Sequence, residues 1–553
     1  MVSLTNLPKS SFASFIPSGF PFYSKTNKKL YNHALLMAFN GLKVARRDCL
    51  TSKIRLRFSG FILFSGKVFS MLTGMLFVII VVRNLSPSEF GVWQNIADVL
   101  GYFILMNTII PSWAGRYVAR GMESAGKTSI LINFAISIPL MLLCFLMAPV
   151  FAKIAGTNSI YYALASFQIV ELYLKPAFEA LANAKKPYLL GYDLAIHEIT
   201  KLFFGFIFVA FLRIGLLGAI VTIILADLID IAFYSIAFID ELKSNIKLNY
   251  ISGWLKGSII SLYSMVGTSL SSFATIMLLI LGGTLARAYL GAVSTIATLV
   301  TYASSLGVAL YPKLLVGGKS EDVEASIKLT LMFATPMTFG ILALAEHLLT
   351  ILNPIYSIAK TILYIAALNS LIVCFTNIVD TIILGTEKVD AQAKFSMKDL
   401  RKSKLFLLPT FSYVYATIDL PILYYFLAYI AKSPFEKAFY FVLINFPISL
   451  MILIMKYKIA KKCLSFKFPL KTIAKYVLAS TIMAFVVKPF GLSLPSRISF
   501  IFALILLGIV VYFAILFMID EETKALVRLT LKELNAQIKK LTSFLGFMHQ
   551  KFI

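Results

Sequence analysis

Two apolar segments of the sequence each carry three charged or titratable side chains spaced four residues apart. The first set is Glu171, Lys175 and Glu179, and the second is Asp193, His197 and Lys201. This spacing places each set on one face of an α-helix. Acidic and basic groups four residues apart can neutralise each other, so a self-compensating ladder is one interpretation of the first set. Since an imidazole and carboxylates exchange protons, the second set fits ion coupling, and it fits a sugar-binding wall as well.

Lys67 is a single charge in the first apolar run, with no acidic residue three or four positions away. Such a lysine either meets an anion such as a phosphate or extends to the lipid head groups. Arg116 ends the second run, where contact with substrate and simple anchoring explain it equally well. The candidate substrate-binding residues are Lys67, Arg116, Glu171, Lys175, Asp193, His197 and Lys201. Asp98 and Asp227 are weaker candidates for ion coupling.

Catalytic, metal and cofactor sites are not indicated. The four cysteines, Cys49, Cys144, Cys374 and Cys463, form no spaced cluster. Gly126-Lys127-Thr128 is the nearest match to a phosphate-binding loop, but it falls in a short connection between apolar runs. A strand–loop–helix unit is absent there, so ATP hydrolysis is not expected.

Apolar segments dominate the 553-residue sequence, which is 59% hydrophobic and 14% charged. Runs long enough to cross a bilayer recur along nearly the whole chain. We therefore predict an all-α polytopic membrane protein with about fourteen transmembrane helices. The connections between the runs are too short to hold a soluble catalytic domain.

The net charge of +26 follows the topology. With the N-terminus inside, lysine and arginine gather in alternate loops, and Arg287 is among the few basic residues of the outer loops. The charge therefore indicates attraction to anionic lipids and not nucleic-acid binding. We expect a multi-pass protein of the cell membrane with both termini in the cytoplasm.

The two ends of the chain differ from its apolar body. Residues 1–57 read as a basic cytoplasmic extension, in which the part before Met37 is either disordered or outside the mature protein. Residues 520–553 read as an amphipathic tail on the inner membrane surface, or as a plain solvated helix.

A short pattern occurs twice, 200 residues apart, each time between two apolar runs. The matching positions are Leu85, Gly91, Ile96 and Ala97 in one copy and Leu285, Gly291, Ile296 and Ala297 in the other. A repeat of this kind predicts two similar bundles facing each other, which is typical of a transporter.

The first copy, 82–93, resembles the first hairpin of polysaccharide-biosynthesis flippases, the Wzx-like exporters of the MOP superfamily. That family has a basic residue, a turn with Leu and Pro, and an aromatic–Gly pair. The corresponding residues here are Arg83, Leu85, Pro87, Phe90 and Gly91. The segments 111–117 and 179–186 are also similar, the latter echoed at 381–388, and the resemblance covers about 59–520.

The resemblance implies two six-helix lobes, at 59–240 and 257–430, with additional C-terminal spans at 438–519. It implies a flippase that translocates a lipid-linked oligosaccharide by alternating access, for polysaccharide or glycoprotein glycan biosynthesis. The carrier would be a polyprenyl or dolichyl phosphate or pyrophosphate. The implied partners are this substrate, membrane lipids and glycosyltransferases of the same pathway, with no cofactor.

Three other functions are alternatives to this one. A cation-coupled drug or metabolite exporter of the same superfamily would usually have twelve spans. A membrane glycosyltransferase or polymerase would need paired carboxylates or basic residues in a sizeable outer loop. A structural membrane protein would not need polar faces on two of its helices.

Overall fold

The computed structural model describes residues 66–524, except for 68, 71, 123, 308–309, 316, 388–402, 494–497 and 522. The predicted N-terminal extension, and the predicted tail apart from its first few residues, lie outside this part. Helices are the only regular elements in the described part. Ten of these helices are long and apolar enough to cross a membrane. The predicted all-α polytopic membrane fold is therefore confirmed.

The first half of the described chain forms a bundle that we call the N-lobe. It consists of the helix Leu72–Asn84, α2 (Pro87–Phe103), α3 (Ile109–Ala119), α4 (Ala125–Ala155), α5 (Ser159–Ala165), α6 (Gln168–Lys185), α7 (Leu189–Gly205), η1 (Phe206–Phe211) and α8 (Leu216–Ala237). The spans predicted at 92–111 and 159–181 are each interrupted by a turn, the first between α2 and α3 and the second between α5 and α6. The short helices α9 (Ile239–Leu242) and α10 (Tyr250–Gly257) follow the N-lobe.

The second bundle is the C-lobe. It consists of α11 (Ile259–Ala297), η2 (Thr298–Gly307), α12 (Leu310–Leu315), α13 (Ser320–Leu352), η3 (Pro354–Ala359), α14 (Lys360–Gly385), α16 (Lys404–Tyr425), η5 (Phe426–Ile430) and α17 (Pro434–Cys463). Gly283, with a φ of 74°, divides α11 into two parts. The spans predicted at 257–282 and 288–311 lie on either side of this residue, and the second continues from α11 into η2. The division proposed from the sequence ended this lobe at residue 430. Because α17 packs against α11, α14 and α16, we group it with the C-lobe.

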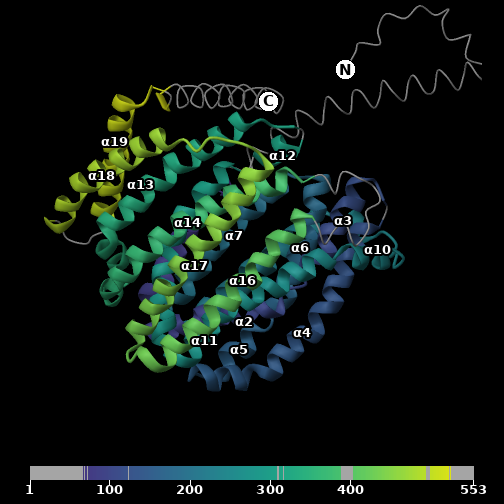
Figure 1. Cartoon of the computed structure of the whole chain (residues 1–553). Coiled ribbons are helices and arrows are strands. Elements are labelled where there is room, and N and C mark those ends of the chain that lie inside the picture. The colour runs from purple at the N-terminus through teal and green to yellow at the C-terminus, as the bar shows by residue number, and fades with distance from the viewer. Residues whose placement is uncertain are drawn as a thin grey trace, which may run out of the picture.

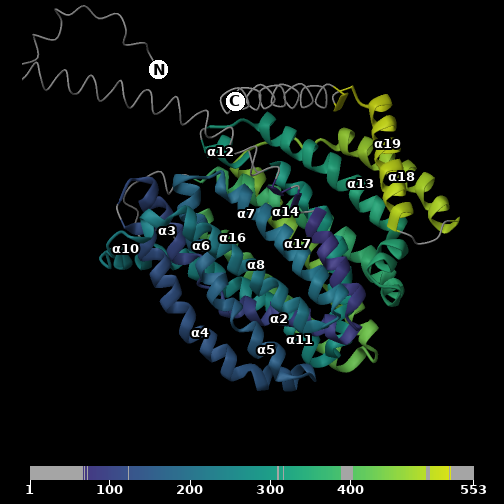
Figure 2. The same ribbon diagram turned by 180° about the vertical axis from the view of Figure 1, so that it is seen from behind.

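Two further helices, α18 (Leu470–Ser493) and α19 (Ile498–Ile519), lie beside α13 (Figures 1 and 2). The hydroxyl of Tyr512 on α19 donates a hydrogen bond of 2.7 Å to the carbonyl of Met332 on α13. Tyr512 is buried, so this contact fixes α19 to the C-lobe.

Local sequence explains where two of these helices begin. Ser86 and Glu89 form a reciprocal capping box at the start of α2, with Pro87 in the first helical turn. Ser433 and Glu436 form the same box at the start of α17, again followed by a proline. In each case the side chains satisfy backbone N–H groups that a helix start leaves without partners.

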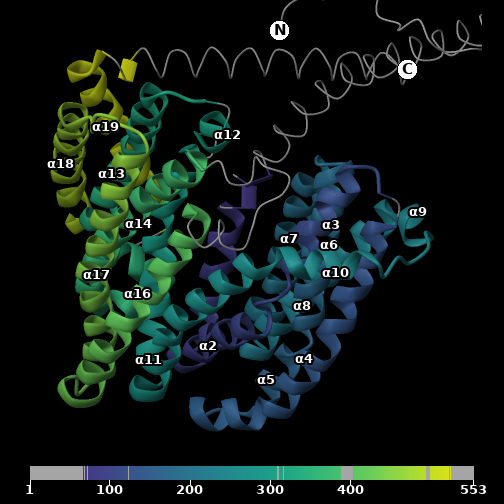
Figure 3. The ribbon, with the colours of Figure 1, turned by 45° about the vertical axis from the view of Figure 1, so that its right-hand side comes forward.

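The two lobes lie closest to each other near α2 and α11, and farther apart toward α3 and α12 (Figure 3). The two copies of the repeat meet where the lobes converge. A Cβ atom at Gly91 would lie only 2.0 Å from the carbonyl oxygen of Thr284, and one at Gly291 would lie 2.7 Å from Cγ of Gln94. Glycine is therefore required at position 91 for α2 and α11 to approach so closely, whereas a larger residue at position 291 would require the side chain of Gln94 to shift.

Apolar side chains on the outside of the bundle match a lipid environment. Phe211 and Ile236 in the N-lobe and Met518 on α19 are 74%, 76% and 85% exposed. Exposure of large apolar residues over many helices is what a hydrocarbon solvent allows and water does not.

Candidate functional site

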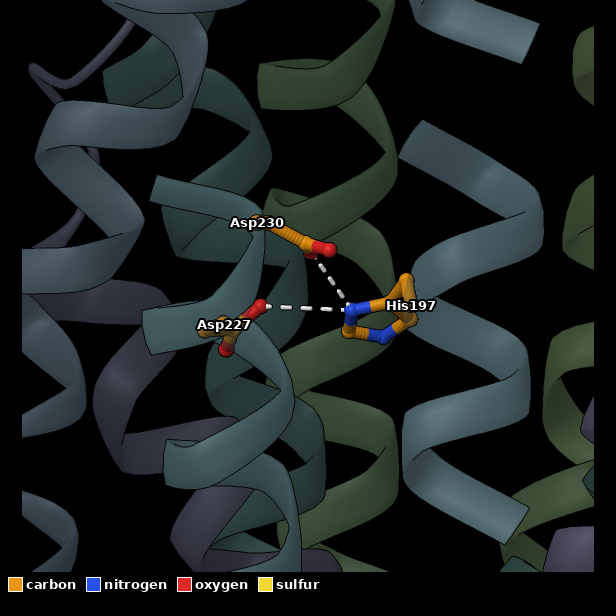
Figure 4. A group of neighbouring side chains, drawn as sticks. All are labelled: His197, Asp227 and Asp230. Carbon is orange, nitrogen blue, oxygen red and sulfur yellow. Dashed lines mark hydrogen bonds and ion pairs between the residues drawn. The ribbon is translucent and has the colours of Figure 1, made fainter. Parts of the chain in front are cut away.

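A buried cluster of charged residues joins α6, α7 and α8 inside the N-lobe. Lys175 Nζ on α6 donates to Asp230 Oδ2 on α8 at 2.5 Å and lies 3.6 Å from Asp227 Oδ1. His197 Nδ1 on α7 lies 2.7 Å from the same oxygen of Asp230 and 3.7 Å from that of Asp227. Figure 4 shows the imidazole directed at both carboxylates. We call these four residues, with the acidic side chains around them, the N-lobe cluster.

The helical spacing seen in the sequence places part of this cluster. Asp193 and His197 are one turn apart on α7, and Asp227 and Asp230 are one turn apart on α8. The cluster therefore brings together Lys175, His197 and Asp227, all of them predicted. It adds Asp230, which was not among the predicted site residues although its spacing from Asp227 was a usable signal.

Further carboxylates surround the four residues. Glu171 and Asp193 are 4% and 2% exposed, and Glu179 interacts electrostatically with Lys175, Asp227 and Asp230. One oxygen each of Glu171, Asp193 and Asp230 is buried without a hydrogen-bond partner in the described part of the chain. The N-lobe cluster is thus richer in acidic groups than in basic ones, so protons or cations must offset the difference.

Lys175 already occupies the place that a metal ion would take in this cluster. The ligand atoms of His197, Asp227 and Asp230 lie within 4.8 Å of one another, a spacing that could hold an ion. The ammonium group of Lys175 lies within hydrogen-bonding distance of two of these residues. The chain therefore supplies the cation itself.

Lys201 belongs to a second polar group, between α7 and the first helix. Its ammonium pairs with Glu198 at 2.8 Å, and Glu198 also accepts hydrogen bonds from Ser70 and Thr73 at 2.9 and 3.3 Å. Lys201 further lies 5.3 Å from the ring centroid of Phe77. The role of Glu198 was not predicted, although its position three residues before Lys201 pointed to a pair.

Lys67 and Arg116 are exposed, in contrast to the N-lobe cluster. Lys67 has no hydrogen-bond or ion-pair partner among the described residues. The guanidinium of Arg116 lies 4.8 Å from the ring centroid of Trp113, one turn earlier on α3, which is a cation–π contact. In the described part of the chain, no hydrogen bond or ion pair joins these two predicted residues to the N-lobe cluster, and both cations are accessible.

Asp98 forms an ion pair across the lobes. Its carboxylate accepts two hydrogen bonds from the guanidinium of Arg287 on α11, at 2.7 and 3.0 Å. Arg287 is 6% exposed and lies within α11, so its expected place in an outer loop was wrong. A carboxylate held in this way has a structural partner, which does not favour the ion-coupling role considered for Asp98.

No protein-family model and no curated protein matches the sequence, but solved structures share its fold. A structure of the lipid II flippase MurJ in an inward closed conformation is 15% identical, with a TM-score of 0.59 over 82% of this chain and 98% of that one. An inward-facing multidrug-resistance MATE transporter of the MOP superfamily is 11% identical, with a TM-score of 0.53 over 71% of this chain and 95% of that one. At these identities the likeness establishes the fold, and the chain has the fold of these two membrane transporters.

Proposed function

We propose that the protein is a flippase that moves a lipid-linked oligosaccharide across the cell membrane by alternating access. Its carrier lipid would be joined to the sugars through a phosphate or pyrophosphate. The observation that carries the proposal is Lys67, an exposed ammonium group without a partner among the described residues. An anionic head group would supply the counter-charge, and exposed Arg116 would offer a second one.

An apolar cavity at the seam between the lobes supports a substrate with a lipid tail. It has a volume of about 240 Å³ and lies between the end of α2 and the first part of α11. Tyr102, Met106 and Phe273 are among its lining residues. A polyprenyl or dolichyl chain could rest there while its head group is bound among polar residues.

The number of helices also supports a flippase over the exporter branch. The chain has α18 and α19 in addition to its two lobes, whereas the exporter branch usually has twelve spans. The match to the flippase structure extends over 82% of this chain, and the match to the exporter over 71%.

The charges of the loops support one orientation in the membrane. The ends that carry α10 and α12 lie on one side of the bundle, and many loop lysines and arginines fall in the connections there. By the positive-inside rule this side would face the cytoplasm. The contact between α2 and α11 would then close the outer side, and its separation would open it.

A cation-coupled exporter is the second candidate, and the N-lobe cluster favours it. The five carboxylates there, Glu171, Glu179, Asp193, Asp227 and Asp230, exceed the charge that Lys175 and His197 can offset. Such a surplus suits a coupling ion or a cationic substrate.

Head-group translocation in proteoliposomes tests the choice between them. The full chain is reconstituted with a fluorescent lipid-pyrophosphate oligosaccharide, and the protected fraction is followed with a quencher that does not cross the membrane. We expect translocation by the wild type and at least a tenfold slower rate for Lys67→Ala, since a hydrogen bond to a charged group contributes about 1.5–3 kcal/mol. Lys471→Ala, at an exposed lysine near the start of α18, is the matched control and should leave the rate unchanged.

Each outcome has a definite meaning. Equal rates for Lys67→Ala and the wild type would keep the flippase and remove Lys67 from its site. No translocation by folded wild type, tested with several glycans and ion gradients, would overturn the flippase. Gradient-driven transport of a cationic dye by the same liposomes would then support the exporter.

A further inference from the structure

We infer that Lys175 is paired reversibly with the carboxylates of the N-lobe cluster. It passes to an anionic head group when a proton or an inorganic cation takes its place beside Asp227 and Asp230. The nature of the ligand rests on the proposed function. The exchange would couple anion binding to cation uptake.

Lys175 is the member of the cluster that can move. Its side chain is 19% exposed and that of His197 is 18% exposed, whereas those of Asp227 and Asp230 are 6% and 0% exposed. A lysine side chain has four flexible methylene groups, whereas the carboxylate of an aspartate is one methylene group away from the backbone of its helix. The ammonium group therefore can turn toward an anion at the open side of the cluster, while the carboxylates remain.

The position that Lys175 would leave is suited to another cation. Two carboxylate oxygens and one imidazole nitrogen, from α7 and α8, lie within 4.8 Å of one another around it. Asp230 Oδ2 is shared between Lys175 at 2.5 Å and His197 at 2.7 Å. Departure of the ammonium without a replacement would leave two buried carboxylates facing each other, which is strongly unfavourable.

The neighbouring groups increase the demand for a cation. Glu171 and Glu179 on α6, Asp193 on α7 and Tyr234 on α8 also face the cluster. Buried oxygens of Glu171, Asp193 and Asp230 have no hydrogen-bond partner among the described residues. With five carboxylates against one lysine and one histidine, transfer of Lys175 to an anion favours the uptake of a proton or a sodium ion. By linkage, that uptake favours anion binding to the same degree.

Calorimetry on the full chain in lipid nanodiscs tests the exchange. The probe is farnesyl pyrophosphate, titrated in two buffers of different ionisation enthalpy, with sodium or choline as the salt cation. We expect wild-type binding to be accompanied by net proton uptake, or to tighten when sodium replaces choline. A parallel titration with inorganic pyrophosphate distinguishes a lipid head group from the free anion.

Two substitutions give opposite expectations. Lys175→Gln should weaken binding at least tenfold, since it removes the cation that meets the probe. Asp230→Asn should bind the probe at least as tightly as the wild type, with less cation uptake, because it frees Lys175. Asp227→Asn provides the same test if Asp230→Asn does not fold. Lys360→Gln, at an exposed lysine paired with Glu346 in the C-lobe, is the matched control and should leave the affinity unchanged.

The outcomes separate this inference from the proposed function. If Asp230→Asn weakens binding as much as Lys175→Gln, the aspartate only supports the site and the exchange is overturned. Binding by the wild type without proton uptake or sodium dependence also overturns it, and leaves the flippase in place. Absence of binding of either pyrophosphate by folded wild type instead counts against the proposed function.

Discussion

The guanidinium of Arg287 forms a bidentate, hydrogen-bonded ion pair with the carboxylate of Asp98, and this pair joins the two lobes. The distances are 2.7 and 3.0 Å. Nearer the start of α2, Ser88 and Thr284 on α11 share a hydrogen bond of 3.0 Å. The pair lies among the contacts of the repeated segments, so the repeat marks the surface through which the lobes meet.

Removal of either charge of this pair should loosen the contact between the lobes. A buried ion pair that loses one partner costs about 3–5 kcal/mol, and we expect about 2 kcal/mol here because Asp98 is 16% exposed. Spin labels at Lys153 and Lys432, exposed residues near the turns that follow α4 and α16, would report the separation by double electron–electron resonance. We expect longer distances in Asp98→Asn and in Arg287→Gln.

The charge-swapped double variant, Asp98→Arg with Arg287→Asp, is the control for this prediction. This variant keeps a pair of opposite charges at the same place. A part of the molecules should therefore again show the short distance between the spin labels that is expected for the wild type. Wild-type distances in both single variants would show that the pair does not hold the lobes together.

Gly91→Ala should destabilise the protein, whereas Gly101→Ala on the same helix should not. A Cβ at Gly91 would meet backbone of Thr284 at 2.0 Å, and one at Gly101 would meet nothing within 4 Å. Since alanine favours a helix by about 1 kcal/mol over glycine, Gly101→Ala should even raise the melting temperature. Thermal unfolding in detergent would measure both. Equal melting temperatures would contradict the close approach of α2 to α11.

Two aspartates of the C-lobe should respond in opposite ways to loss of charge. Both oxygens of Asp419 on α16 are buried without a hydrogen-bond partner among the described residues. Asp380 on α14 instead accepts a hydrogen bond of 2.9 Å from Lys456 on α17. Asp419→Leu should therefore keep or raise the melting temperature, and Asp380→Leu should lower it by leaving Lys456 unpaired. A large loss of stability in Asp419→Leu would indicate that Asp419 has a ligand in the folded protein.

Glu198 should prove important for the attachment of the first helix to α7. Glu198→Ala removes the acceptor of Ser70, Thr73 and Lys201, so we expect a loss of about 2–4 kcal/mol. Glu198→Gln keeps an acceptor and should lose less. The double variant Glu198→Ala with Lys201→Ala should be more stable than Glu198→Ala, because no unpaired ammonium remains. Thermal unfolding gives the order, and a double variant less stable than the single one would argue against the ion pair.

The sequence predicted features that depend on neighbours along one helix. Glu171 and Lys175 on α6, and Asp193 and His197 on α7, were correctly placed on polar helix faces because their separation matches the turn of a helix. The capping signal of Ser86, Pro87 and Glu89 is also local, since it lies within four residues, but it was not among the predicted features.

Contacts between helices could not be predicted in this way. Arg287 and Asp98 are 189 residues apart, and Lys175 and Asp230 are 55 apart. Asp98 was considered for ion coupling, and Arg287 was expected in an outer loop. Both predictions were made from neighbours along the chain, and such neighbours do not reveal a partner on another helix.

What the sequence alone determined is the class of protein and the polar faces of the two helices that carry Glu171 with Lys175 and Asp193 with His197. Those features follow from apolar length, turn residues and a period of about 3.6 residues, all of which are local. Only the tertiary structure decided which polar faces meet, that Lys175 and Lys201 are paired, and that Lys67 is exposed without a partner among the described residues. Those outcomes depend on how the helices and the two lobes pack, which is set by shape complementarity over long sequence separations.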